Sequence, residues 1–249
     1  ESHVDRSIDN PRIFLENNIL GTFNILEATR YFYSNLSNQK KENFRFHHIS
    51  TDEVFGTLAK DGKFDETSNY DPKSPYSASK ASSDHLIKAW HNTYGIPITI
   101  SNCSNNFGPF QNPEKLIPLV INNCLKNKDI PIYGDGLNVR DWLYVEDHID
   151  AIFLILEKGK LGNCYCIGGY GEKTNLEIVN LVCSLIDEYK PKKNPHNRLI
   201  NFVEDRLGHD KRYAINPDLI ERELGWKPKH SLKNGLEETI KWYLSRNNF

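Results

Sequence analysis

Two short segments carry the side chains best suited to moving protons. In "YSASK", Tyr76 and Lys80 lie four residues apart at the start of an expected helix, so their side chains project from the same face. An ammonium group beside a phenol favours the phenolate and lowers a pKa of about 10, which would let Tyr76 act as a base toward an alcohol near neutral pH. Taken alone, such a pair is more often an ordinary surface pair.

The second segment is "ISTDEVFG", residues 49–56, where Thr51, Asp52 and Glu53 follow an apolar run. Acidic residues often cap the element after a strand, so a solvated loop is one interpretation. The other is an acid and base pair, which would need opposite protonation states at one pH and therefore different surroundings for the two carboxyl groups. Which of the two interpretations holds depends on which other side chains the fold brings next to Asp52 and Glu53.

The surrounding elements indicate that these segments meet. We expect a helix from about Ile13 to Phe32 and a strand over "FRFHHIS". A second helix is expected with Ser74 as N-cap, Pro75 at its first position and Gly95 after its end. "IPITISNCSNNFGP" then predicts another strand that breaks into a polar loop. Strands separated by helices predict an α/β, doubly wound parallel sheet, and ligands bind at the carboxyl edge of such sheets. Asn105 and Asn106 should reach that edge too.

The alternation becomes less regular after residue 108. We expect residues 109–249 to form mainly a smaller mixed lobe, with some segments returning to the domain of residues 1–108. "IGGYGEKTN" places glycines between a strand and a helix, but Thr174 stands where a dinucleotide-binding turn needs a third glycine. A loop with Thr174 as a helix N-cap is the preferred interpretation.

Composition excludes several classes of partner. The formal charge is -2 and the pI is about 6.5, which offers no general attraction to nucleic acid or anionic membranes. No apolar run approaches the roughly 18 residues of a membrane span, and no signal peptide is apparent, so a cytoplasmic location is expected.

The five cysteines include no C-x-x-C pair and should be buried thiols. His47 and His48 should point to opposite faces of a strand, and no metal site is expected. The absence of methionine indicates a fragment of a longer chain.

A family resemblance runs through essentially the whole chain. The segments that carry it are "ESHVDRSI", "NNILGTFNILEATR", "ISTDEVFG", "SPYSASKASSDHL", "SNNFGP", "KLIPLVI", "PIYGDGLNVRDWLYVEDH", "GEKTN", "RLGHDKRYAI" and "ELGWKP". They resemble the extended short-chain dehydrogenase/reductase family, and within it the nucleotide-sugar 4,6-dehydratases. Tyr-x-x-x-Lys marks only the superfamily, whereas the Thr-Asp-Glu, Arg-Asp-Trp-Leu-Tyr-Val-Glu-Asp-His and Gly-His-Asp-x-Arg-Tyr-Ala segments are more specific. The first strands of this Rossmann-like fold and its glycine-rich turn do not appear in the sequence.

The resemblance implies an NAD-dependent lyase that converts dTDP-glucose into dTDP-4-keto-6-deoxyglucose. Tyr76 would take the proton of the sugar 4-hydroxyl, with Lys80 tuning the phenol and Thr51 bonding the same oxygen. Glu53 would then remove the C5 proton while a protonated Asp52 gives its proton to the departing 6-hydroxyl. Tyr76, Lys80 and Asn106 would contact NAD. The product would serve deoxysugar synthesis such as that of dTDP-rhamnose.

The resemblance also implies substrate contacts and an assembly. Residues expected to contact the nucleotide sugar are Ser2, Asn105, Lys115, Leu116, Tyr133, Arg140, Asn175, Arg206 and His209. Arginine suits the diphosphate because its planar fork can bind two oxygens at once. A homodimer is expected through the helices of residues 17–30 and 77–90. Two alternatives stay open, namely a related nucleotide-sugar epimerase, decarboxylase or dehydratase, and a non-catalytic fragment or binding module.

Overall fold

A three-stranded parallel sheet forms the centre of the larger lobe in the computed structural model, which describes residues 1–246. Its strands are β1 (Phe46–Thr51), β2 (Ile98–Cys103) and β7 (Cys164–Ile167), in the order β1-β2-β7. β1 pairs with β2 from Phe46 opposite Ile98 to Thr51 opposite Cys103, so the two strands end side by side. The expected parallel α/β sheet is therefore confirmed.

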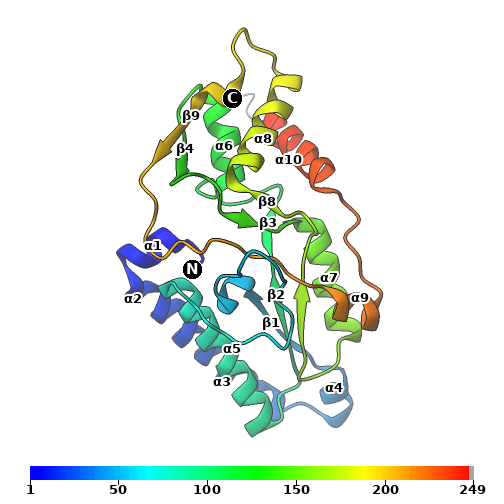
Figure 1. Ribbon diagram of the computed structural model, residues 1–249. Helices are drawn as coiled ribbons and strands as arrows, with labels where there is room; N and C mark the ends of the chain where they lie inside the picture. The colour runs from blue at the N-terminus through cyan, green and yellow to red at the C-terminus, as the bar shows by residue number, and fades with distance from the viewer. Residues whose placement is uncertain (247–249) are drawn as a thin grey trace.

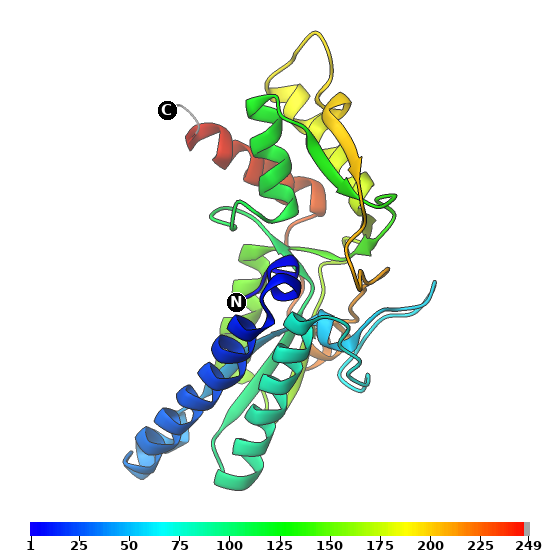
Figure 2. The ribbon, with the colours of Figure 1, turned by 90° about the vertical axis from the view of Figure 1, so that its left-hand side faces the viewer.

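Helices cover both faces of this sheet (Figures 1 and 2). On one face, Ile98 and Ile100 of β2 pack against Ile87 of α5 (Pro75–Tyr94) and Leu26 of α3 (Gly21–Ser34). Alternate residues of the strand point the other way, and there the core lies against α7 (Val145–Lys158) and α9 (Asp218–Leu224). His47 and His48 follow the same alternation. His47 bonds Thr99 and Ser101, whereas His48 bonds Asp84 of α5.

The smaller lobe lies beyond the carboxyl ends of the strands, at the top of Figure 1. Its helices α6 (Leu116–Lys126), α8 (Asn175–Tyr189) and α10 (Leu232–Arg246) enclose a separate apolar core with the parallel pair β4 (Ile130–Tyr133) and β9 (Ile200–Val203). Two further pairs join the lobes. One is parallel, β3 (Asn105–Phe107) with β6 (Trp142–Tyr144), and the other is antiparallel, β5 (Val139–Arg140) with β8 (Lys173–Thr174).

The connecting segments contain more helix than the sequence predicts. The helix expected from about Ile13 to Phe32 is present as the continuous run of α2 (Pro11–Phe14), the π-helical η1 (Leu15–Leu20) and α3, and a further short helix, α1 (Val4–Asp9), precedes it. The polar insert contains α4 (Asn38–Asn43), with Lys40 and Lys41 in its last turn, where positive charge favours the negative end of the helix dipole. The acidic segment is a 3₁₀ turn, η2 (Asp52–Phe55), and a similar turn, η3 (His196–Leu199), precedes β9.

Other expectations about the chain can be compared directly. The two C-terminal helices are present, separated by the segment that contains Gly225 and Pro228. Four cysteines are buried thiols, and Cys164 is partly buried. Within residues 1–246, no helix is long and apolar enough to cross a membrane. The division of the chain after residue 108 stays a prediction, although β7 does belong to the sheet of the larger lobe and α7 packs against it.

Candidate active site

The acidic turn begins where β1 ends and is held in place by its own backbone. Thr51 is the N-cap of η2, and its hydroxyl accepts a hydrogen bond from the Glu53 N–H at 3.3 Å. Gly56 follows with a φ of 79°, and a Cβ there would lie 2.4 Å from the carbonyl oxygen of Asp71. A larger residue would therefore displace the turn. As a result, Asp52 and Glu53 leave the end of the strand in fixed directions.

Helix α5 brings Tyr76 and Lys80 to this turn. Ser74 is the N-cap and Pro75 occupies the first turn, as expected from the sequence, and Ser77 completes a reciprocal capping box with Ser74. Tyr76 is buried, and the Lys80 Nζ donates to the carbonyl oxygen of Ile49 in β1 at 2.8 Å. The second turn of the helix is thus anchored to the strand that carries the two acids.

The two adjacent carboxyl groups have different surroundings. Burial raises the pKa of Asp52 well above its usual value, and the charges of Glu53 and Asp141 raise it further. Burial also raises the pKa of Glu53, but the cations Arg140 and Lys115 oppose that effect. Asp52 is therefore the member of the pair that keeps its proton, and Glu53 is the one that ionises more readily. This is the separation that an acid and a base need.

The phenol of Tyr76 differs from the expectation. Burial and then the negative charge of Glu53 raise the pKa of Tyr76 well above its usual value, instead of lowering it. Burial also lowers the pKa of Lys80, so its charged form is less favoured than that of an exposed lysine. The spacing of the two side chains does not reveal the cost of placing a phenolate in a dry site next to a carboxylate.

The end of β2 completes this edge. The Asn102 Nδ2 donates to the Thr51 carbonyl oxygen at 2.9 Å, which ties the two strand ends together. Asn106 donates through its amide nitrogen to Ser104 O at 3.1 Å, while its Oδ1 is buried and has no partner among the described residues. The Oδ1 of Asn105 and the Oδ2 of Asp52 are also buried without a partner. These unpaired polar atoms are the ones that a bound ligand would satisfy.

A cavity of about 240 Å³ opens between the two lobes above this edge. Its wall includes ten of the residues singled out in the sequence: Glu53, Asn105, Asn106, Lys115, Leu116, Tyr133, Arg140, Asn175, Arg206 and His209. Ser2 is not part of the wall, and its carbonyl oxygen accepts from the Lys115 Nζ at 2.5 Å. The wall does not include Thr51, Asp52, Tyr76 or Lys80 either. Most of the expected contacts are nevertheless brought to one cavity.

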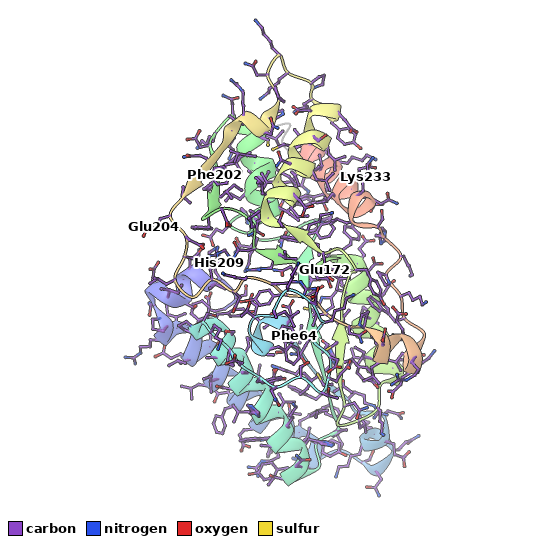
Figure 3. All side chains as sticks on the ribbon, viewed as in Figure 1. Phe64, Glu172, Phe202, Glu204, His209 and Lys233 are labelled. Atoms are coloured by element: carbon purple, nitrogen blue, oxygen red, sulfur yellow. The ribbon has the colours of Figure 1, made fainter. Side chains whose placement is uncertain are left out.

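Three basic side chains reach the cavity from separate segments. Arg140 is buried, lies over the Tyr213 ring at 4.3 Å, and donates to the carbonyl oxygens of Val139 and Asp210. Arg206 lies 3.2 Å from an Asp5 carboxylate oxygen. His209 Nδ1 lies 2.6 Å from Asp205. Figure 3 shows His209 at the level where the upper lobe meets the helices below it. An anion in the cavity would therefore meet positive charge from β5 and from the segment after β9.

Other residues of the wall were not found by sequence reasoning. They include His3, Asp5, Gln111, Glu114, Trp142, Asp210 and Tyr213. Asp210 and Tyr213 belong to the "RLGHDKRYAI" segment that carried the resemblance. Their closeness in sequence to His209 could therefore have indicated them as residues of the wall. Asp5 was in a quoted segment as well, but nothing in its local pattern indicates that it would pair with Arg206. That pairing depends on how α1 lies against the segment after β9.

The glycine-containing segment "IGGYGEKTN" has a structural explanation. The N–H groups of Gly169 and Gly171 donate to the Asp141 carboxylate at 3.0 and 2.8 Å. A Cβ on Gly169 would lie 2.0 Å from the Trp142 carbonyl oxygen, so no side chain fits. Thr174 and Glu177 form the capping box of α8, which confirms Thr174 as an N-cap. The loop therefore wraps a buried carboxylate.

Comparisons with known proteins agree with this geometry. The family described as GDP-mannose 4,6 dehydratase matches residues 1–239. A dTDP-glucose 4,6-dehydratase of Escherichia coli is 54% identical over 258 residues, covering 100% of this chain and 72% of that protein. One from Xanthomonas campestris is 50% identical, covering 98% of this chain and 70% of that protein.

Solved structures give the same result. DesIV, a dTDP-glucose 4,6-dehydratase from Streptomyces venezuelae solved with NAD bound, superposes with a TM-score of 0.89 at 41% identity, over 99% of this chain and 71% of that one. The dTDP-glucose 4,6-dehydratase of Bacillus anthracis in complex with NAD has a TM-score of 0.82 at 44% identity, over 93% and 69% of the two chains. The chain thus belongs to the family of the dTDP-glucose 4,6-dehydratases.

Proposed function

We propose that this chain carries the catalytic groups for dehydrating dTDP-glucose to dTDP-4-keto-6-deoxyglucose. The observation that carries the proposal is the split between Asp52 and Glu53. One carboxyl group is buried and keeps its proton, while its neighbour opens into the cavity beside Arg140 and Lys115. A sugar that loses water across two adjacent carbons needs one group to take a proton and another to give one, and this turn offers both.

Each residue then has a definite task. Tyr76 removes the proton from the 4-hydroxyl of the glucose, and Thr51 hydrogen-bonds the same oxygen. Glu53 takes the C5 proton, which the neighbouring 4-keto group has made acidic. Asp52 gives its proton to the 6-hydroxyl, which leaves as water, and Glu53 returns a proton to C5. NAD supplies the acceptor for the hydride from C4 and its return to C6.

The chain's own residues fit such a cofactor. Asn106 Oδ1 is a buried acceptor without a partner in the described chain, and Lys80 has used only one donor, on Ile49 O. Both lie at the end of the sheet that also holds Tyr76. Asn106, Lys80 and Tyr76 would hold NAD there. Because burial raises the pKa of Tyr76, its ionisation needs positive charge close by, and we assign that role to Lys80, one turn further along α5.

The cavity wall supports a nucleoside diphosphate sugar as substrate. Arg140 and Arg206 supply positive charge on one side, as two phosphate groups require, and His209, whose pKa burial lowers, adds a hydrogen-bonding ring beside them. Asn105, Lys115 and Asn175 supply polar contacts, while Leu116 and Tyr133 supply apolar surface. Ser2 enters this set only through the hydrogen bond from Lys115 to its carbonyl oxygen.

The direct test is product formation by the complete gene product that contains these residues. It is incubated with NAD and dTDP-glucose, and the 4-keto-6-deoxy product is identified by mass spectrometry and NMR. Loss of one water with oxidation at C4 and reduction at C6 is the expected result. UDP-glucose in a parallel reaction tests the nucleotide. A product epimerised at C4 with no loss of water would replace the dehydratase by the epimerase alternative, which has no use for adjacent Asp52 and Glu53.

We also propose that the protein forms a homodimer through α3 and α5. These helices lie side by side (Figure 2), and the η1–α3 segment exposes Leu20, Phe23, Ile25 and Phe32, with between 41% and 58% of each side chain accessible. A second copy would cover this surface.

Light scattering should give twice the chain mass, and Ile25→Glu should give the monomer. Phe153→Glu, at an exposed position of α7, is the matched control. A monomeric parent protein would contradict the dimer. The expected cytoplasmic location stays a prediction.

A further inference from the structure

A second cluster of chemically capable side chains lies away from the cavity. Glu146 is in the first turn of α7, His230 is in the segment before α10, and Glu238 is inside α10. One potential ligand atom from each of the three lies within 4.8 Å of the others. None of them belongs to the cavity wall described above. Three segments that are far apart in sequence therefore present an imidazole and two carboxylates to one point.

The imidazole is held in an orientation that suits a metal ligand. Asp147 is buried, and its carboxylate accepts the N–H groups of Lys229 and His230, both at 3.0 Å. The His230 Nδ1 lies 3.0 Å from the same carboxylate. With Nδ1–H donated to Asp147, the ring keeps the lone pair on Nε2 for another partner. A carboxylate behind the histidine is the usual outer support of a metal-bound imidazole.

Neither glutamate is neutralised by a basic side chain of the described residues, and Glu238 is also oriented by a tyrosine. The Tyr144 hydroxyl donates to one oxygen of Glu238 at 3.1 Å, and the Tyr144 ring packs on His230 with the centroids 4.6 Å apart. Within residues 1–246, no lysine or arginine forms an ion pair with Glu146 or Glu238. Neighbouring acids differ, because Asp150 pairs with Lys229 at 2.5 Å and Glu237 with Lys233 at 3.8 Å.

We propose that Glu146, His230 and Glu238 bind one divalent transition-metal ion, for which Zn²⁺ is the best match. Three protein ligands of nitrogen and oxygen with water in the fourth position is a common Zn²⁺ arrangement, whereas Mg²⁺ and Ca²⁺ prefer oxygen alone. Ligands about 2.1 Å from a tetrahedral ion lie ~3.4 Å apart. The present separations, which are within 4.8 Å, must shorten to that value on binding, and the two glutamate side chains are exposed and therefore free to rotate.

The position of the cluster defines what the ion does. Glu146 belongs to a helix packed on the sheet, and Glu238 belongs to a helix packed in the core of the smaller lobe. His230 lies in the segment that connects α9 with α10. A bound ion would therefore tie the two lobes together on the side opposite the helix pair α3 and α5 (Figure 1). Its role is structural, and the chemistry in the cavity does not require it.

Calorimetric titration of the metal-free, tag-free protein with Zn²⁺ tests the proposal. One ion should bind per chain, Mg²⁺ at the same concentration should not compete, and the melting temperature should rise with Zn²⁺ concentration. The isosteric Glu146→Gln and Glu238→Gln variants should each bind at least tenfold more weakly. Glu237→Gln, one position away on α10, is the matched control and should bind like the parent.

The ligands around the bound ion provide a second test of the zinc site. X-ray absorption at the zinc edge should show one imidazole nitrogen together with oxygen ligands. Equal affinity in all three glutamine variants, a zinc shell with several imidazoles, or no Zn²⁺ binding by the parent would overturn the proposal. Circular dichroism of each variant confirms folding, and both substituted glutamates are exposed, so the exchange for glutamine should be tolerated.

Discussion

The groups proposed for the chemistry and those proposed for holding the nucleotide are built in different ways. Thr51, Asp52 and Glu53 are consecutive, and Tyr76 and Lys80 share one helix turn. Their positions are fixed by a strand end, two caps and the bond from Lys80 to Ile49 O. Arg140, Arg206 and His209 come from β5 and an irregular segment after β9. The residues that contact Arg140 and His209, which are Asp210 and Asp205, lie outside helices and strands. Arg206 instead pairs with Asp5 of α1.

This difference separates two physical requirements. Proton transfer depends on distances and on pKa values, so its groups lie on the rigid carboxyl edge of the sheet, where burial sets protonation. Binding a diphosphate depends on summed charge, which several side chains from different segments can supply. Substitutions among the groups at the sheet edge, the catalytic side, should therefore act on the rate of chemistry. Substitutions among the groups that would hold the diphosphate, the binding side, should act on substrate affinity.

Tyr76→Phe should have the largest effect. The substitution keeps the ring packed against Phe14 but removes the only proton acceptor proposed for the 4-hydroxyl, so turnover should fall about 10³- to 10⁴-fold. The KM for the sugar nucleotide should change little. Tyr70→Phe, which removes another buried hydroxyl near α5, serves as the control for loss of a phenol. Unchanged turnover in Tyr76→Phe would exclude its role as the base.

Glu53→Gln should stop the reaction at a later point. Without the carboxylate, the C5 proton has no acceptor, so product formation should fall about 10²- to 10³-fold. Oxidation at C4 does not use Glu53, and the absorbance of the reduced nicotinamide should therefore appear in a single turnover and persist. Normal dehydration by this variant would contradict the assignment of Glu53 and would weaken the contrast between the two sides of the cavity.

Asp52→Asn tests the protonation difference through pH. In the folded chain the pKa of Asp52 lies above its unfolded value, so the protonated form is favoured by folding. That contribution is complete below the unfolded pKa and is lost as the pH rises through the folded one. Dehydration by the parent should accordingly decline at alkaline pH. The variant should be about 10²-fold slower, without that decline.

Stability gives an independent measure of the same group. The amide that replaces the carboxyl group in Asp52→Asn cannot ionise, so the free energy of unfolding of the variant relative to the parent should increase from about pH 5 to about pH 9. Urea unfolding at both values measures this difference. A relative stability that does not change between these two pH values would mean that the Asp52 carboxyl is already ionised in the folded protein.

The same contrast explains how much the sequence could predict. The strand, the cap at Ser74 and the Tyr76–Lys80 spacing are local patterns, and each of them led to the observed element. The grouping of Asn105 with the acids followed from parallel β topology alone. Arg140, by contrast, would have passed as an ion pair with Asp141 without the family resemblance. In the structure Asp141 binds Gly169 and Gly171, while Arg140 lies over Tyr213.

Two features lay beyond any local pattern. The raised pKa of Tyr76 comes from burial among residues that are distant in sequence, so the Lys80 spacing alone gave the wrong direction. The Glu146, His230 and Glu238 cluster depends on how α10 lies beside α7, and its residues have no metal-ligand spacing in the chain. Both depend on the relative placement of elements that sequence periodicity does not determine.

Arg140→Lys should have the smallest effect of these changes and should fall on the binding side. Lysine keeps the positive charge but loses the planar fork and the stacking on Tyr213, so the KM for the sugar nucleotide should rise about tenfold while kcat changes little. Arg222→Lys, on an exposed face of α9, is the matched control and should leave both constants unchanged. A fall in kcat at constant KM would mean that Arg140 acts through Asp52 and Glu53, whose pKa values its charge lowers, and the two sides of the cavity would then be electrostatically coupled.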